Sequence, residues 1–523
     1  MLLFIVFSLF GVLVLIVPRL AVIGAEDERA EIDQIIQHAP KGFFTPATLP
    51  TATTRIEAIY PEWEQSEVVL ISVPLASALV DPYALGFVLE FLEAVVDHVP
   101  VGVLYNRDEE RLLGRFISKI ESRPKLQAGI DRIDFVESRV QSFWIRDFGP
   151  QFGMAGNGDL LTIDSIYRLI DLESVYDPRS VSDYNVSKQR DYANDLSPNF
   201  VANYLRSERD FETKLIRPPL HLHGGDFAVD GNGNVFVSED TITENGGDIE
   251  FIEQVFERYY GSINLHALSG PKGNSAKHLD LLFKVATPDI VFLNRAPGAR
   301  DNESAHSRKT RVQIERRLSL DLDYLKRNLP EKRILSLPMP SLAFASREKQ
   351  LHELKREIVN VACRNAKVSV WWALEGDPNH PETVNANNAV QMELLLKTGV
   401  KIDFNLESHL ELAAQALLGV GLDEYYDTYV EEQAIYRSYT NSLIVVNGEG
   451  KSLILLPRYL PQLGETPEQY AEFEAEVERA YLSAYPNAQL EWIGSDAITS
   501  LGGSIHCMSI GVPLRKNLRS PRS

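Results

Sequence analysis

The sequence predicts an α/β protein built from repeated units, each made of a strand hairpin, a helix and a further strand. Three observations support this prediction. Strand–turn–strand patterns recur along the chain, amphipathic helices lie between them, and 44% hydrophobic with 24% charged residues among 523 is typical of a globular protein. Repeated α/β units commonly surround a shared centre, and ligands bind where the ends of the units meet.

The first segment, "MLLFIVFSLFGVLVLIV", is continuously apolar until Pro18 and Arg19. Such a leading apolar run is typical of an export segment. We therefore interpret residues 1–25 as a signal peptide or an N-terminal membrane anchor, with residues 2–23 as the part that associates with a membrane. On this interpretation the rest of the chain is exported, to the periplasm or the extracellular space, or is anchored there. The two cysteines of the chain are too few for a disulfide framework.

The net charge of −21 argues against a nucleic-acid partner, because phosphate backbones would be repelled and no cluster of Lys and Arg offsets the acidic residues. The same acidic field tolerates a cationic ligand. Charge is therefore compatible with a cationic substrate.

Four hairpins are expected along the chain. Three of them turn at glycine-containing sequences, Gly-Asn-Gly in residues 151–164, Asp-Gly-Asn-Gly in 226–240 and Asn-Gly-Glu-Gly in 442–457. Asn-Gly and Asp-Gly adopt the positive φ values that tight hairpin turns need. The fourth hairpin, residues 281–293, turns at Thr-Pro-Asp.

Helices are expected between these hairpins, the first over residues 81–99. A second helix has a clear start, because Thr466 can cap it, Pro467 suits its first turn and Gln469 completes a capping box. Its expected buried stripe consists of Tyr470, Phe473, Val477 and Tyr481.

The organisation expected from these patterns is one domain over residues 45–515. Residues 295–435 break the alternation, because they are long, polar and mostly helical by pattern, and we interpret them as an insertion within that domain. Cys363 lies off the apolar stripe of one expected helix there, so we expect a structural or incidental thiol on a surface helix.

Polar residues stand just before the hairpins, where a rigid scaffold can direct them to one point. They occur in the sequences "SFWIRDFGP", "HLHGGD", "KHLD" and "SYTN", and in "GGSIHC" near the end of the chain. Each has an ordinary explanation. Asp147 can pair with Arg146, His278 and Asp280 can form a solvated face, and Cys507 can be a buried apolar thiol. A zinc site made of His221, His223, His278 and Asp280 is an alternative, although no established metal motif supports it.

Taken together, five sequences resemble the ordered motifs of the agmatine deiminase and bacterial peptidylarginine deiminase family. They are "PEWEQSEVVLISVP", "FWIRDFGP", "HGGDFAVDGNGNVFVSE", "KHLDLLFKVATPD" and "GGSIHCMSIGVP". The resemblance spans about residues 57–513 and leaves 295–435 largely unmatched. It implies the pentein fold, an α/β propeller of five pseudo-symmetric ββαβ modules around a central active site, which would explain the repeated hairpins.

The resemblance also implies a role for each matched residue. Asp147 and Asp280 would hold a guanidinium group, Cys507 would attack its central carbon, and His278 would act as general acid and base. His506 would be structural. Further substrate-binding positions implied by the match are Trp144, Arg146, Asp226, Asn441 and Gly503. No metal and no organic cofactor would be required.

The sequence departs from agmatine deiminases at two places. It has His223-Gly224-Gly225 where they usually show Glu-Gly-Gly. It has Lys277-His278-Leu279-Asp280-Leu281 where they show Gly-His-x-Asp-Asn. These departures and the expected export favour arginine in a peptide or protein over agmatine. A catalytically inactive pentein that serves as a binding protein, and a metallohydrolase, are the alternatives from other classes.

Overall fold

The computed structural model describes residues 55–515, except for 168–192, 263, 272–277, 300–304, 343–346, 370–372, 374–379, 405, 423–434 and 462–464. The expected export segment, residues 1–25, lies outside the described residues, as do residues 45–54 of the expected domain. Within the described part of the chain, no helix combines the length and the apolar character needed to cross a membrane.

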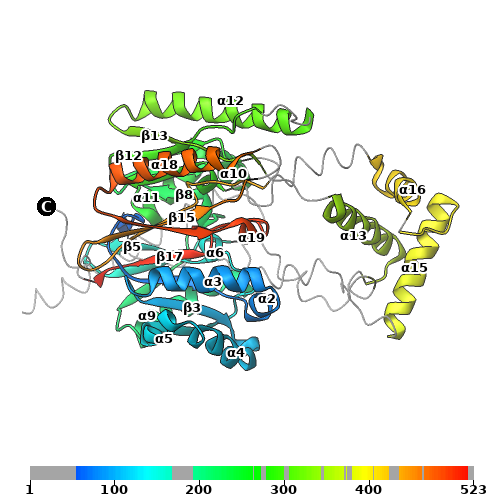
Figure 1. Cartoon of the computed structure of the whole chain (residues 1–523), viewed down its shortest axis with the longest axis horizontal. Coiled ribbons are helices and arrows are strands. Elements are labelled where there is room, and N and C mark those ends of the chain that lie inside the picture. The colour runs from blue at the N-terminus through cyan, green and yellow to red at the C-terminus, as the bar shows by residue number, and fades with distance from the viewer. Residues whose placement is uncertain are drawn as a thin grey trace, which may run out of the picture.

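Among the described residues the strands form five sheets, which Figure 1 shows with helices beside them. Every one of these sheets contains an antiparallel strand pair next to a parallel one. The first sheet has the strand order β1 (Ile56–Ile59), β5 (Gln151–Ala155), β6 (Leu160–Ile163) and β7 (Thr213–Ile216). The second has the order β10 (Asn264–Leu268), β9 (Asn234–Ser238) and β8 (Phe227–Val229). The third has the order β11 (Phe283–Thr287), β12 (Ile290–Asn294) and β13 (Arg333–Leu337). The other two are β14 (Leu443–Val446), β15 (Ser452–Arg458) and β16 (Gln489–Gly494); and β17 (Ser509–Pro513), β2 (Ser66–Ser72), β3 (Val101–Asn106) and β4 (Ile133–Ser138).

Helices connect the parallel strands, as crossover connections require. The first crossover contains α2 (Leu75–Val80) and α3 (Pro82–Val95), and the next contains α4 (Glu110–Glu121) and α5 (Pro124–Ala128). The remaining crossovers contain α9 (Ser197–Ser207), α10 (Glu239–Glu244) with α11 (Ile249–Tyr260), α12 (Ala305–Asn328) and α18 (Pro467–Ala484). The predicted order of hairpin, helix and strand is therefore confirmed in four of these sheets. In the fifth, the antiparallel partner of β2 is the distant strand β17, and two helix–strand crossovers follow β2.

The four predicted hairpins are the pairs β5–β6, β8–β9, β11–β12 and β14–β15. Their glycine turns have the expected backbone, with positive φ at Gly158, Gly231, Gly233 and Gly450. Local turn chemistry is sufficient to position these hairpins, because an L-residue with a side chain rarely adopts this φ.

The two predicted helices form as well. Thr466 caps α18 by accepting a hydrogen bond from the Gln469 backbone N–H at 3.2 Å. Tyr470, Val477 and Tyr481 are buried, whereas Phe473 is half-buried against the same core. The helix expected over residues 81–99 is α3, which ends earlier, at Val95, and is capped by Asp81.

Residues 295–435, expected to form one insertion, contain two different parts. The helix α12 and strand β13 complete the third sheet, because β13 pairs with β12 in parallel. The helices α13 (Arg347–Ala366), α15 (Pro381–Thr398) and α16 (Glu407–Leu418) share a small core of their own and lie to one side of the sheets (Figure 1). Cys363 is fully buried in this core together with Leu354 and Ile358, so it belongs to the buried face of α13, and its expected position off the apolar stripe is wrong.

The last strand of the described residues lies beside one of the first. Strand β17 pairs with β2 in antiparallel, in a register that places Ile510 opposite Leu70. The loop that ends at Cys507 comes just before β17, so this pairing carries the loop to the sheet formed by the first part of the domain.

Candidate active site

The loop between α19 (Asp496–Thr499) and β17 presents Cys507, which is buried. The loop is attached to α6 (Ile145–Phe148), because the Arg146 backbone N–H donates to the Cys507 carbonyl at 2.9 Å. A Cβ atom at Gly503 would lie 2.6 Å from Trp144 Cζ3 and 2.9 Å from the Cys507 Cβ. Glycine at position 503 therefore allows the loop to pass between Trp144 and the thiol.

Asn441 joins the thiol to Asp280. Its Nδ2 donates to Asp280 Oδ2 at 3.0 Å and lies 3.2 Å from Cys507 Sγ. The Cys507 Sγ itself lies 3.6 Å from Asp280 Oδ2. All three side chains are buried, although their positions in the sequence span more than 220 residues.

The second carboxylate of the site, Asp147, lies beside the imidazole of His278, with 3.2 Å between Asp147 Oδ1 and His278 Nδ1. Gly225 makes this approach possible, because a Cβ there would lie 2.9 Å from each of these two atoms. His278 comes just before the short helix η5 (Leu279–Leu281), which carries Asp280. Thus η5, α6 and the Gly224–Asp226 helix η4 together place Asp147, His278 and Asp280 in one site.

The electrostatics of the site favour a cation. Burial raises the pKa of the Cys507 thiol well above its usual value, and the neighbouring Asp280 and Asp147 raise it further. Burial also opposes ionisation of Asp280, but hydrogen bonding to His506 and the nearby charges of His506, His278 and Arg146 outweigh it and keep the pKa of this carboxyl below its usual range. A thiol beside two carboxylates would ionise more easily once a positive charge lies next to it.

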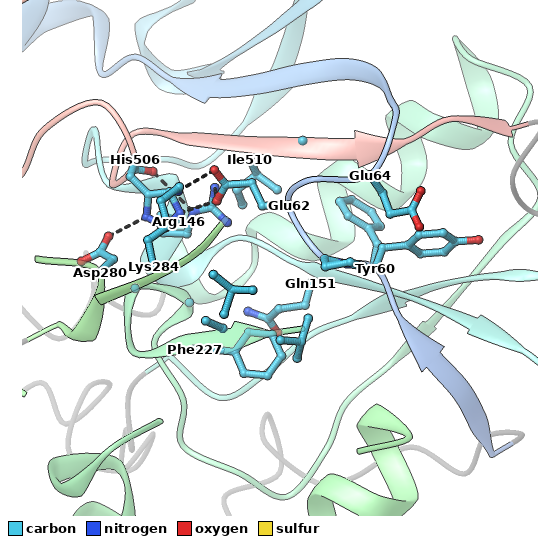
Figure 2. A pocket seen from close by; sticks show the side chains of 18 of the residues that line it. Tyr60, Glu62, Glu64, Arg146, Gln151, Phe227, Asp280, Lys284, His506 and Ile510 are labelled. Carbon is cyan, nitrogen blue, oxygen red and sulfur yellow. Dashed lines mark hydrogen bonds and ion pairs between the residues drawn. The ribbon is translucent and has the colours of Figure 1, made fainter. Parts of the chain in front are cut away.

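A buried charge network continues from Asp280 away from the thiol. His506 is hydrogen bonded at both ring nitrogens, with 2.6 Å from Nδ1 to Asp280 Oδ2 and 2.6 Å from Nε2 to Glu62 Oε2. Glu62 also accepts from Lys284 Nζ at 2.7 Å and lies 3.5 Å from Arg146 Nη2. Figure 2 shows His506 between Asp280 and Glu62, with Arg146 and Lys284 beside them.

A pocket borders this network. It is lined by network members, among them Glu62 and Asp280, and by Tyr60, Gln151 and Phe227 (Figure 2). Its lining includes Asp280 and His506 but not Cys507. Sequence reasoning missed Glu62 and Lys284, although both lie within motifs that carry the family resemblance.

Two of the expected substrate-binding residues contact other parts of the protein. The Arg146 side chain is paired with Glu62, and its Nε donates to the His506 carbonyl at 3.4 Å. Asp226 accepts a hydrogen bond from the Leu279 backbone N–H at 2.8 Å. Burial raises the pKa of Asp226 to about 7. Both residues support the segments that carry Asp147, His278 and Asp280, whereas Trp144, Asn441 and Gly503 lie beside the thiol.

The histidines of the zinc alternative are engaged in hydrogen bonds. His221 Nε2 and His223 Nε2 each lie 3.0 Å from the Tyr167 carbonyl oxygen. His223 Nδ1 lies 2.9 Å from His278 Nε2. Within the described ranges, no group of three or more His, Cys, Asp or Glu side chains is arranged to hold a metal ion.

Comparison with known proteins supports the resemblance read from the motifs. A model of the Porphyromonas-type peptidyl-arginine deiminase family matches residues 58–513. Among solved structures, the agmatine deiminase of Enterococcus faecalis is 17% identical, with a TM-score of 0.52 over 88% of this chain and 96% of that chain. An agmatine deiminase of C. jejuni is 13% identical, with a TM-score of 0.50 over 88% of this chain and 98% of that chain.

A Porphyromonas gingivalis protein described as an arginine deiminase is similar to the same extent. It is 14% identical, with a TM-score of 0.52 over 87% of this chain and 98% of that chain. At these identities the structural likenesses concern the fold, and the fold they share with this chain is the mixed α/β fold of pentein-type deiminases.

Proposed function

Because the chain belongs to the Porphyromonas-type peptidyl-arginine deiminase family, we propose that it hydrolyses the guanidinium group of arginine in a peptide or protein to citrulline and ammonia. The observation that carries this proposal is the buried cluster in which Cys507 Sγ lies 3.6 Å from Asp280 while His278 lies against Asp147. A thiol, an imidazole and two carboxylates in one site match the chemistry of a planar cation that must be held, attacked and protonated.

The two carboxylates bind the substrate in this proposal. A guanidinium group has several N–H donors in one plane and can be held by a carboxylate on each side. Asp280 Oδ1 is buried and has no hydrogen-bond partner among the described residues, so it is available to accept from the substrate. In this proposal the ring of Trp144, which packs against Gly503 in the loop that carries Cys507, covers the aliphatic stem of the arginine.

The reaction then proceeds through Cys507. The substrate cation and protonated His278 favour the thiolate, which attacks the central carbon and forms a C–S bond. His278 gives its proton to the leaving nitrogen, the C–N bond breaks and ammonia departs, which leaves a thiouronium on Cys507. Neutral His278 takes a proton from water, and the hydroxide attacks the same carbon. The C–S bond then breaks, the hydroxyl proton of the adduct passes to solvent, where ammonia becomes ammonium, and the ureido product and the thiolate are released.

Agmatine is the second candidate substrate, because its guanidinium can undergo the same steps to give N-carbamoylputrescine. The similarity to agmatine deiminase structures favours it. The replacement of Glu-Gly-Gly by His223-Gly224-Gly225 and the proposed export favour peptidylarginine. We propose residues 1–25 as the export segment or anchor, which fractionation of cells that express the full chain will test.

The experiment that tests the function measures citrulline-type product and ammonia together. The substrates are agmatine, free arginine, and peptides with an internal or a C-terminal arginine. We expect turnover to be best with a peptide substrate and to vanish in Cys507→Ser, because the serine hydroxyl is a much poorer nucleophile. Activity of Cys507→Ser near that of the wild type would overturn the covalent mechanism, and no turnover of any guanidine would overturn the proposed function.

We also propose that the five sheets are the five ββαβ modules of a closed pentein propeller. The strand pattern shared by the five sheets supports this arrangement, and so does the pairing of β17 with β2. In such a propeller the loops that carry Asp147, His278, Asp280, Asn441 and Cys507 surround the centre, which explains why residues so distant in the sequence share one site.

A further inference from the structure

The imidazole of His278 contacts a second imidazole, that of His223. His223 Nδ1 lies 2.9 Å from His278 Nε2, and the two rings are nearly perpendicular, with 82° between their planes. On its other side, His223 Nε2 lies 3.0 Å from the Tyr167 carbonyl oxygen. The chain of contacts thus runs from a backbone carbonyl through two imidazoles to the Asp147 carboxylate, 3.2 Å from His278 Nδ1.

The acceptors at the two ends determine where the protons lie. A carbonyl oxygen only accepts, so His223 Nε2 carries a hydrogen. In neutral His223 the other nitrogen, Nδ1, is then an acceptor, and His278 Nε2 must donate to it. With that hydrogen on Nε2, protonation of His278 places its second hydrogen on Nδ1, and the Asp147 carboxylate, an ion-pair partner at 3.2 Å, favours this charged form.

The four ring nitrogens therefore share three hydrogens, which gives the pair one net positive charge. When His278 Nδ1 gives up its hydrogen, two hydrogens remain and Nδ1 becomes the basic atom, directed toward Asp147. A fourth hydrogen would place two N–H groups against each other across the 2.9 Å contact and would break it. The pair can thus hold one exchangeable proton while its hydrogen bond is intact.

We infer that His223 is a positioning residue that fixes the tautomer of His278, leaves His278 Nδ1 as the proton-transfer atom, and shares with it the proton given to the leaving group. This inference rests on the proposed deiminase function and adds to it a proton-sharing histidine pair. His223 acts through His278 and does not contact the substrate.

Other charged groups also face this pair. Asp147 on α6, Asp226 on η4 and Asp280 on η5 are the carboxylates that interact with His278. His221 stacks edge-on against His223, at 5.2 Å between ring centroids, and its Nδ1 lies 3.4 Å from Glu244 on α10. A substitution at position 223 leaves all of these groups in the chain. It changes the acceptor that faces His278 Nε2 and the contact of His223 with the Tyr167 carbonyl.

Two substitutions at position 223 are expected to shift the pH dependence of kcat in opposite directions. In His223→Asn the side-chain carbonyl takes the place of Nδ1 and accepts from His278 Nε2, but it is a weaker base. We expect the alkaline limb of the kcat–pH profile to move to lower pH, because protonated His278 is held less strongly. In His223→Asp a carboxylate faces Nε2, and the limb should move to higher pH, by about one unit or more.

The separate effects on kcat and on KM distinguish this positioning role from a purely structural one. We expect kcat to fall roughly tenfold to a hundredfold in His223→Asn with little change in KM, since Asp147 and Asp280 still hold the substrate. His221→Asn is the matched control. This variant loses the same kind of Nε2 contact with the Tyr167 carbonyl. It keeps His223 as the acceptor for His278 Nε2, so the alkaline limb of its kcat–pH profile should stay at the wild-type position.

The measurement uses the full chain and the guanidine that the wild type turns over best. Alkaline limbs that coincide in the wild type, His223→Asn and His223→Asp would overturn the inference, even if the Cys507-dependent activity is present. Wild-type protein with ¹⁵N-labelled histidine provides a second test that needs no variant. We expect scalar coupling across a hydrogen bond between Nδ1 of one imidazole and Nε2 of another, and its absence would overturn the pair whether or not any guanidine is hydrolysed.

Discussion

For single residues, the pKa of the Cys507 thiol is a property that would differ between the free protein and the protein with bound guanidinium. Burial and the carboxylates of Asp280 and Asp147 raise the pKa of the thiol in the free protein. A bound guanidinium would bring a positive charge to the same carboxylates and lower the pKa of the thiol again. The nucleophile would then form mainly when its substrate is present, which protects the thiol from other electrophiles.

This coupling can be measured with two alkylating agents of nearly the same size. Chloroacetamidine carries an amidinium cation and chloroacetamide is neutral, and in both the thiolate displaces chloride. At pH 7 we expect chloroacetamidine to inactivate the protein at least about tenfold faster, because it supplies the charge that favours the thiolate. Equal inactivation rates, after correction for the rates with a free thiol in solution, would show that the carboxylates do not control Cys507.

The second residue-scale prediction concerns Asp226. Burial raises the pKa of this carboxyl to about 7, so folding favours its protonated form. Its contribution to stability is complete below its unfolded pKa, near 4, and is lost as the pH rises through about 7. Asp226→Asn stays neutral at every pH. We therefore expect the wild type to lose ~2–4 kcal/mol of unfolding free energy between pH 5 and pH 8 relative to this variant.

Urea unfolding at several pH values gives this difference directly. The comparison cancels the other buried carboxyls with raised pKa values, Asp164 and Asp195, since both proteins contain them. Parallel stability curves for the two proteins would contradict the prediction.

At the scale of elements, the site depends on how closely the 502–507 loop approaches α6. Gly502 has a φ of 108°, and Gly503 leaves no room for a Cβ beside Trp144. The hydrogen bond from the Arg146 N–H to the Cys507 carbonyl then fixes the loop to the helix. Asp147 and Cys507, the proposed guanidinium-binding and nucleophilic residues, are thus placed by backbone contacts between two short segments.

Gly503→Ala tests this packing. The added methyl group would overlap Trp144 and the Cys507 Cβ, so we expect a stability loss of about 1–3 kcal/mol together with a large loss of kcat. Gly494→Ala, at the end of β16, is the matched control because its nearest neighbour would be 4.0 Å away. Thermal unfolding and turnover of the two variants decide the point, and an active, stable Gly503→Ala would show that the loop does not need the close approach.

At the scale of the whole molecule, the division of residues 295–435 decides which parts are needed for folding. Strand β13 runs along β12 in the third sheet, from Arg333 beside Ile290 to Leu337 beside Asn294. The helices α13, α15 and α16 instead bury their apolar side chains in a separate core. The two parts should therefore differ in what their removal does.

We expect replacement of residues 347–418 by a short flexible linker to leave cooperative unfolding and the turnover of a small guanidine substrate intact. Removal of residues 305–337 should prevent folding, because it exposes the edge of β12 and the core under α12. Circular dichroism melts and the ammonia assay on both deletions check this. Loss of the fold on removal of 347–418 would mean that the three helices are part of the main domain.

The sequence by itself determined the features that depend on a few neighbouring residues. Asn-Gly turns, the Thr466 cap and the alternating apolar strands predict hairpins and helices locally, and the ordered motifs identified the family and the candidate residues Asp147, His278, Asp280 and Cys507. Only the tertiary structure decided which of these polar groups meet. Glu62 reaches His506 across 444 positions, and His223 reaches His278 across 55. No local pattern encodes such pairings, because they arise when separate sheets bring their connecting loops together and the buried groups must find partners there.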